Sequence, residues 1–136
     1  MNALPRRLRP RLRPRLSLWT LVLAALLPVP AAIAHGAGTP RHGGVVQLAN
    51  DLIFELVAKD DGATIYIEDH DRPVATAGFG GKLGVLLAGV KADAPLKPAA
   101  PNALVASGLK FGPGAKVVAV ITMPQNQSLA VRFTLR

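Results

Sequence analysis

The stretch Leu129-Ala-Val-Arg-Phe-Thr-Leu135, near the end of the 136-residue chain, decides the fold class. Its large apolar residues occupy every second position, with small or polar residues between them. This alternation is typical of a β-strand that has one buried face and one exposed face. The preceding run Lys116-Val-Val-Ala-Val-Ile-Thr122 is rich in β-branched residues, which favour strands. The two runs predict the last two strands of a β-domain.

Shorter runs of the same kind recur toward the N-terminus, and turn residues separate them. They cover residues 45–48, 52–58, 63–68, 74–77, 82–87 and, more weakly, 104–107. Asp61-Gly62 predicts a tight hairpin, because glycine readily takes the positive φ that such a turn requires. A second reversal is expected at residues 69–73, and a glycine loop at residues 78–81. Residues 93–101 contain three prolines, so we expect a loop or a ragged edge strand there.

These strands predict an all-β fold for residues 45–136. We expect a small antiparallel immunoglobulin-like β-sandwich, in preference to a small barrel. About 100 residues are enough for one domain with its own core. The chain has no cysteine, which excludes stabilising disulfides, thiol nucleophiles and thiolate metal sites.

The first 34 residues have the parts of a secretory signal peptide. Six arginines lie within the first fifteen residues, an apolar run follows at 16–27, and Ala32-Ile-Ala34 supplies the small residues of a cleavage site. We expect a signal peptide helix over residues 1–34, cleaved after Ala34, and a periplasmic protein with no membrane span after processing. A cut after Gly36 and a retained membrane anchor are the alternatives. Residues 35–44 carry four glycines and one proline, which predicts a flexible Gly/His arm.

The charge distribution excludes nucleic acid as a partner. The whole chain has 16 Lys and Arg against 8 Asp and Glu, but residues 35–136 have only ten against the same eight. The basicity therefore belongs mostly to the targeting segment. We also expect no enzyme, because the carboxylate pairs are turn residues and neither serine after residue 34 lies in a nucleophile-elbow sequence.

Three histidines after residue 34 offer the chemistry of a metal site. Cleavage after Ala34 would make His35 the N-terminus, where its free amine and imidazole form a chelate suited to copper(II). His42, in the glycine-rich arm, is expected to contribute a second imidazole.

The third histidine lies in the predicted reversal Glu68-Asp-His-Asp71, which carries three carboxylates. Oxygen ligands and an imidazole on one turn, together with the arm, predict a Cu²⁺ or Zn²⁺ site. Its ligands would be His35, His42, Asp69, His70 and Asp71. A turn without any ligand role is the alternative, because Asp often bonds its own backbone in turns and an exposed histidine there needs no function.

Three segments of the chain resemble a known family. They are Arg41-His-Gly-Gly-Val-Val46, Leu52-Ile-Phe-Glu-Leu-Val57, and Ile-Tyr-Ile-Glu-Asp-His-Asp-Arg-Pro-Val at residues 65–74. The series is similar to the small N-terminal β-domain of periplasmic adaptor subunits of heavy-metal efflux pumps, over roughly residues 41–87. The resemblance implies a periplasmic β-sandwich associated with metal homeostasis, with His42, Asp69 and His70 on the matched segments. It does not imply the pump subunit itself, because the coiled hairpin and lipoyl-like portions of a full adaptor are missing.

A second resemblance is to periplasmic copper-resistance carriers whose mature chain starts with histidine. It rests on His35 and the Asp-His turn, although that family places one residue between Asp and His, whereas Asp69 and His70 are adjacent here. The leading hypothesis is an exported protein that binds a divalent metal, copper or zinc, as a carrier or buffer in metal homeostasis. The alternative is a metal-free interaction module that docks through an edge strand or loop to an envelope or heavy-metal efflux partner.

Overall fold

The computed structural model describes residues 38–99 and 101–136. The strands are β1 (Val45–Ala49), β2 (Leu52–Lys59), β3 (Gly62–Asp69), β4 (Arg72–Pro73), β5 (Gly80–Leu87), β6 (Val90–Ala99), β7 (Ala103–Ser107), β8 (Lys116–Met123) and β9 (Gln127–Thr134), with a 3-10 turn at Pro124–Asn126. The predicted all-β, antiparallel class is confirmed. The expected signal peptide, its cleavage site after Ala34 and His35 lie outside the described residues. Within the described part of the chain, no helix has the length and apolar character needed to cross a membrane.

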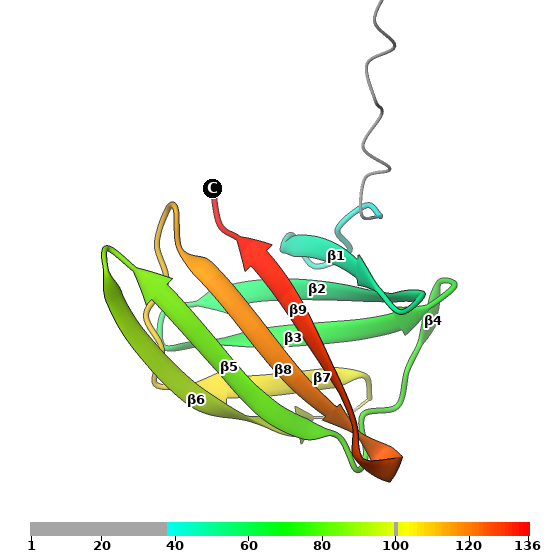
Figure 1. Cartoon of the computed structure of the whole chain (residues 1–136). Helices are drawn as coiled ribbons and strands as arrows, with labels where there is room; N and C mark the ends of the chain where they lie inside the picture. Colours follow the sequence, from blue (N-terminus) through cyan, green and yellow to red (C-terminus); the bar gives the residue numbers. More distant parts are fainter. Residues whose placement is uncertain (1–37, 100) are drawn as a thin grey trace, which may run out of the picture. The chain divides into compact units, whose positions relative to one another are not determined.

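The strands form one hydrogen-bonded path in the order β1-β2-β3-β7-β6-β5-β8-β9, with β4 added beside β3. Strand β6 pairs with β5 over residues 90–96 and with β7 over residues 97–99, so it joins two layers. Figure 1 shows these layers: β5, β8 and β9 cross obliquely over β2, β3 and β7. The two ends of the path, β1 and β9, lie side by side. The domain is therefore a nearly closed barrel.

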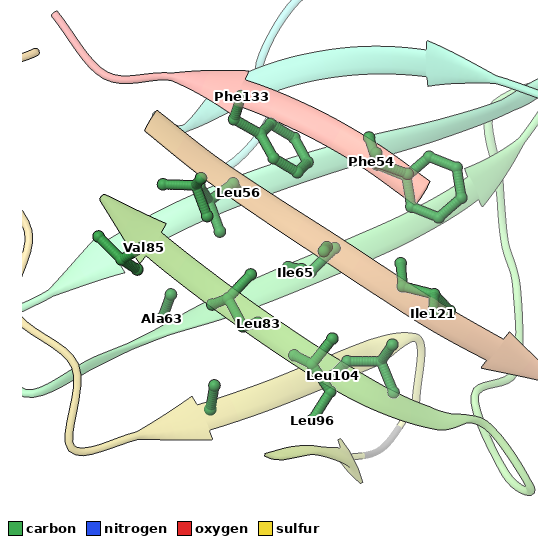
Figure 2. Close-up of a cluster of buried hydrophobic side chains, with 14 of the residues drawn as sticks. Phe54, Leu56, Ala63, Ile65, Leu83, Val85, Leu96, Leu104, Ile121 and Phe133 are labelled. Carbon is green, nitrogen blue, oxygen red and sulfur yellow. The ribbon is translucent and has the colours of Figure 1, made fainter. Parts of the chain in front are cut away.

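The hydrophobic core fills the space between the two layers (Figure 2). Phe54 from β2 and Phe133 from β9 are its two largest fully buried side chains. Ile65 of β3, Leu83 of β5 and Ile121 of β8 pack with them and are also fully buried. The alternation in the last strand is thus confirmed, because Val131 and Phe133 face the core whereas the residues between them are exposed.

Tight turns join successive strands of the β1–β4 layer. The predicted hairpin at Asp61-Gly62 is confirmed, since Lys59 pairs with Gly62. Gly62 has φ +151°, and a Cβ atom there would lie 2.2 Å from the carbonyl oxygen of Ala106, so only glycine fits. The reversal between β3 and β4 is also confirmed. It places His70 and Asp71 at positive φ, a conformation in which His and Asp are enriched among non-glycine residues.

One expectation for local structure was wrong, and for a second segment the structure decides between two alternatives. Residues 74–77 are not a strand, and the pairing with β3 is made instead by the two-residue β4. Most of the segment expected as a loop or ragged edge strand belongs to β6, which excludes the loop. Its prolines, Pro95 and Pro98, fit because β6 pairs with β5 in one part and with β7 in the other. Each part of β6 therefore has one edge that is not hydrogen-bonded to another strand. Proline is tolerated at such an edge, because its missing N–H group is not needed there.

The immunoglobulin-like sandwich stays a prediction. The two crossing layers with one core between them agree with a sandwich, whereas the continuous strand path through β6 agrees with the barrel that the sequence left as the alternative.

Replacing Phe133 by Asp is expected to abolish cooperative folding. A carboxylate in the core loses its hydration, and this cost together with the lost packing is comparable to the whole stability of a small domain, about 5–15 kcal/mol. The control is Lys116→Asp, an exposed position on the outer side of the neighbouring strand, which should change stability by about 0.5 kcal/mol or less. Thermal unfolding followed by far-ultraviolet circular dichroism distinguishes them. A cooperative transition at the parent temperature in both variants would contradict the core assignment.

Candidate functional site

Glu55, Tyr66 and Glu68 lie on the outer face of the layer formed by β2 and β3. Phe54 and Leu56 belong to the core, so Glu55 between them points away from it. Tyr66 is paired with Glu55 across the two strands and shares this face. Glu68, two residues further along β3, lies on it as well.

The N-terminal arm lies across this face and is held there by the Glu55 carboxylate. The backbone amides of Arg41, His42 and Gly44 donate to Glu55 over 3.0, 2.8 and 2.8 Å. The Nδ1 atom of His42 lies 2.9 Å from the same carboxylate. Gly44 allows this close approach, because a Cβ atom there would lie 2.3 Å from the carbonyl oxygen of Leu56. With these partners, Glu55 is only 5% exposed although it faces away from the core.

The hydrogen bonds at Glu55 keep it ionised. Burial by itself would raise the pKa of this carboxyl. The amide of Gly44, the ring and amide of His42 and the amide of Arg41 outweigh burial and hold the pKa of Glu55 below its ordinary value. An ionised carboxylate only accepts hydrogen bonds, so Nδ1 of His42 is the donor in this pair.

His42 is fixed in orientation by two contacts. Its ring stacks on that of Tyr66, with centroids 3.6 Å apart and planes 7° from parallel. Its Nδ1 atom is bound to Glu55. The Nε2 atom makes no hydrogen bond with any residue that the structure describes, and the side chain is 38% exposed. A histidine whose other ring nitrogen donates to a carboxylate is the arrangement common among metal ligands.

Arg41 ties the arm to the turn between β3 and β4. Its Nε atom lies 3.3 Å from a carboxylate oxygen of Glu68, and its Nη2 atom lies 2.7 Å from Asp71. Glu68 is 8% exposed, so the guanidinium supplies a counter-charge to a nearly buried carboxylate. The arm and the predicted metal-binding turn are thus in direct contact. The contact is an ion pair between Arg41 and Asp71 and not a shared metal ion.

The turn itself carries an exposed histidine. Nδ1 of His70 is hydrogen-bonded to the Asp69 carboxylate. That hydrogen bond, followed by the charges of Asp69, Asp51 and Asp71, raises the pKa of His70 above its ordinary value. As in His42, the Nε2 atom is left free.

The structure brings some of the predicted ligands into one region. His42 lies on the β2–β3 face, and Asp69, His70 and Asp71 lie at its end, with Arg41 between the two groups. Within residues 38–99 and 101–136, no three His, Asp or Glu side chains are close enough to hold a metal ion. His35 lies outside the described residues, so the five-ligand site remains a prediction.

Four residues of this region were missed as participants: Arg41, Glu55, Tyr66 and Glu68. A signal existed for one of them, because Glu55 interrupts the apolar run 52–58, where an ionised side chain needs a partner. Comparison with protein-family models, curated proteins and solved structures gives no match. The function is therefore argued from the site.

Glu55→Gln is expected to cost about 2 kcal/mol, because the amide nitrogen of Gln cannot accept from the arm. The stabilisation by Glu55 is complete above the ordinary pKa of 4.5 and is lost as pH falls through the lower folded-state value. The gap in unfolding free energy between parent and variant should therefore narrow as the pH falls below 4.5. Urea unfolding at several pH values measures it. A gap that stays constant with pH would contradict an ionised Glu55.

Proposed function

We propose that the protein is an exported, periplasmic β-sandwich of the immunoglobulin-like kind that binds a divalent metal, copper(II) first and zinc second, as a carrier or buffer. The observation that carries the proposal is shared by the two described histidines. In both, a carboxylate engages Nδ1, which leaves Nε2 oriented for coordination. The proposed role is metal binding, and no catalytic step is proposed for either histidine.

His42 is the anchored ligand in this proposal. The stack on Tyr66 and the bond to Glu55 fix its ring before any ion arrives, which reduces the ordering cost of coordination. His35, seven residues earlier, would add its amine and imidazole if export frees it as the N-terminus. Nitrogen donors of this kind suit copper(II), which takes tetragonal nitrogen and oxygen ligands, and they also suit zinc.

The turn would contribute His70 more readily than its carboxylates. Asp71 is paired with Arg41 at 2.7 Å, so coordination by Asp71 requires the guanidinium to move away. A dication placed beside Arg41 is also repelled by it. His70 has no such obstacle, because its side chain is 84% exposed and its Nε2 is free.

Calorimetric titration with copper(II) and zinc tests the proposal on the protein as purified after export. His42→Ala should weaken copper binding at least about tenfold, and Glu55→Gln about tenfold or more, because the Glu55 carboxylate orients the His42 imidazole. One alanine inserted before His35 should weaken binding by moving the amine away. His70→Ala should also weaken binding, with little change in the thermal stability of the metal-free protein.

The pH dependence gives a second readout. Metal-bound imidazoles must be neutral, so copper affinity should fall on acidification. The raised pKa of His70 means that its contribution is lost at a higher pH than that of an unperturbed histidine. Lys59→Ala, an exposed change in β2, is the control and should bind copper as the parent does. Equal copper affinity in every variant would leave the metal-free interaction module as the function.

A further inference from the structure

Acidic residues are concentrated in one layer of this domain, whereas basic residues occur in both. Seven of the eight carboxylates lie between residues 51 and 71, in or beside β2 and β3. The eighth, Asp93, is the only acidic residue in the layer that contains β5, β8 and β9 with the first part of β6. That layer carries four cations, at Lys82, Lys91, Lys116 and Arg132. This charge distribution was hidden in the sequence, where these four cations are spread over fifty residues.

Strand register places these cations on one outer face. Leu83 and Val85 of β5 are in the core, so Gly84 and Leu86 face outward. Leu86 is paired with Lys91 on one side and with Lys116 on the other. The neighbouring row of paired residues on the same face crosses four strands. It consists of Asp93 on β6, Gly84 on β5, Val118 on β8 and Arg132 on β9.

The centre of this face is a hollow of about 470 Å³. Gly84 has no side chain, so it lowers the surface between its neighbours Leu86 and Val118. Three cations, Lys91, Lys116 and Arg132, and one carboxylate, Asp93, stand around this apolar floor. Val120, one outward position further along β8, is 39% exposed and extends the apolar surface.

The cations around the hollow lack counter-charges. Lys82 is paired with Asp93 at 3.3 Å, which uses the one carboxylate on this face. Lys91, Lys116 and Arg132 make no ion pair or side-chain hydrogen bond with any residue that the structure describes. An apolar floor with three uncompensated cations matches a ligand that has carboxylates on both sides of an apolar side chain.

We propose that the outer face of β5, β8 and β9 is a docking surface for an acidic segment of a partner protein that inserts one apolar side chain over Gly84. The layer in question is the one that crosses over β2 and β3 in Figure 1. This face is built from other strands than the His42 region, so the proposal goes beyond metal binding and does not depend on it.

The test uses the protein as purified from expressing cells and a blocked peptide, Asp-Glu-Leu-Glu-Asp, as probe. Amide chemical shifts in nuclear magnetic resonance spectra should change in a saturable way at Gly84, Leu86 and Val118. The same peptide with lysine in place of each acidic residue should leave them unchanged. High salt should weaken the binding, because exposed charges are screened.

Two sets of variants locate the interaction. Lys91→Glu with Arg132→Glu should weaken peptide binding about tenfold. Lys59→Glu with Arg72→Glu removes the same charges from the other layer and should have a much smaller effect. Gly84→Val fills the hollow. Its Cβ atom would lie 2.9 Å from the end of the Asp93 side chain, which can move, and at an ordinary contact distance of 3.8 Å from the Val118 carbonyl oxygen, so the fold should tolerate the change while binding is lost.

Three results would overturn the proposal. The first is no saturable shift on this face at millimolar peptide. The second is equal weakening by the two charge-reversal pairs, which would indicate attraction to net charge alone. The third is concentration-dependent self-association in analytical ultracentrifugation that Lys91→Glu with Arg132→Glu abolishes, because the face would then bind a second copy of the chain. Thermal unfolding of each variant confirms that it is folded.

Discussion

One buried carboxylate on the outer face of the sheet determines the path of the residues that precede the first strand. Glu55 faces away from the core, yet it is 5% exposed. An ionised carboxylate removed from water without partners would cost several kcal/mol. Three backbone amides and one imidazole, from residues 41, 42 and 44, meet this requirement together. Because these donors lie close together in the sequence, satisfying Glu55 fixes the path of the whole segment. The orientation of His42 and the position of Arg41 beside the β3–β4 turn both follow from it.

The covered outer face also explains the composition of β2 and β3. Both strands are buried on their inner side by the core and on part of their outer side by the arm. Strands covered on both faces read as nearly continuous apolar runs, and residues 52–58 have that character except at Glu55. The coverage has a cost as well. The hydroxyl of Thr64, on the outer face of β3, is buried and has no hydrogen-bond partner among the described residues. Its β-branched shape suits the strand, but nothing in the structure compensates the lost hydration.

Local patterns in the sequence predicted what depends on local chemistry. The alternation at residues 129–135 gave the buried face of β9, and Asp61-Gly62 gave the hairpin between β2 and β3. The prolines of residues 93–101 left a loop and a ragged edge strand as alternatives, because proline tolerance depends on which neighbour each part of β6 has, and pairing is not visible in a single segment. The same limit applies to the site. Glu55 and its donors are separated by 11 to 14 residues, so their contact depends on how an irregular segment returns to the sheet. The histidines and Asp69 could be named from the sequence, but Glu55 could be identified as the partner of His42 only from the fold.

The two outer faces differ in whether their charges are already satisfied. On the β2–β3 side, Arg41 forms ion pairs with both Glu68 and Asp71, and His42 and the arm amides surround Glu55. On the β5–β9 side, Lys91, Lys116 and Arg132 make no ion pair with any described residue, and the one carboxylate there, Asp93, is paired with Lys82. Packed sheets lie about 10 Å apart, and the Debye length at physiological ionic strength is about 8 Å. A metal ion bound near His42 would therefore change the potential over the cationic face only slightly. The proposed coordination and the proposed docking are thus expected to act as separate properties of one small domain, unless a partner contacts both faces.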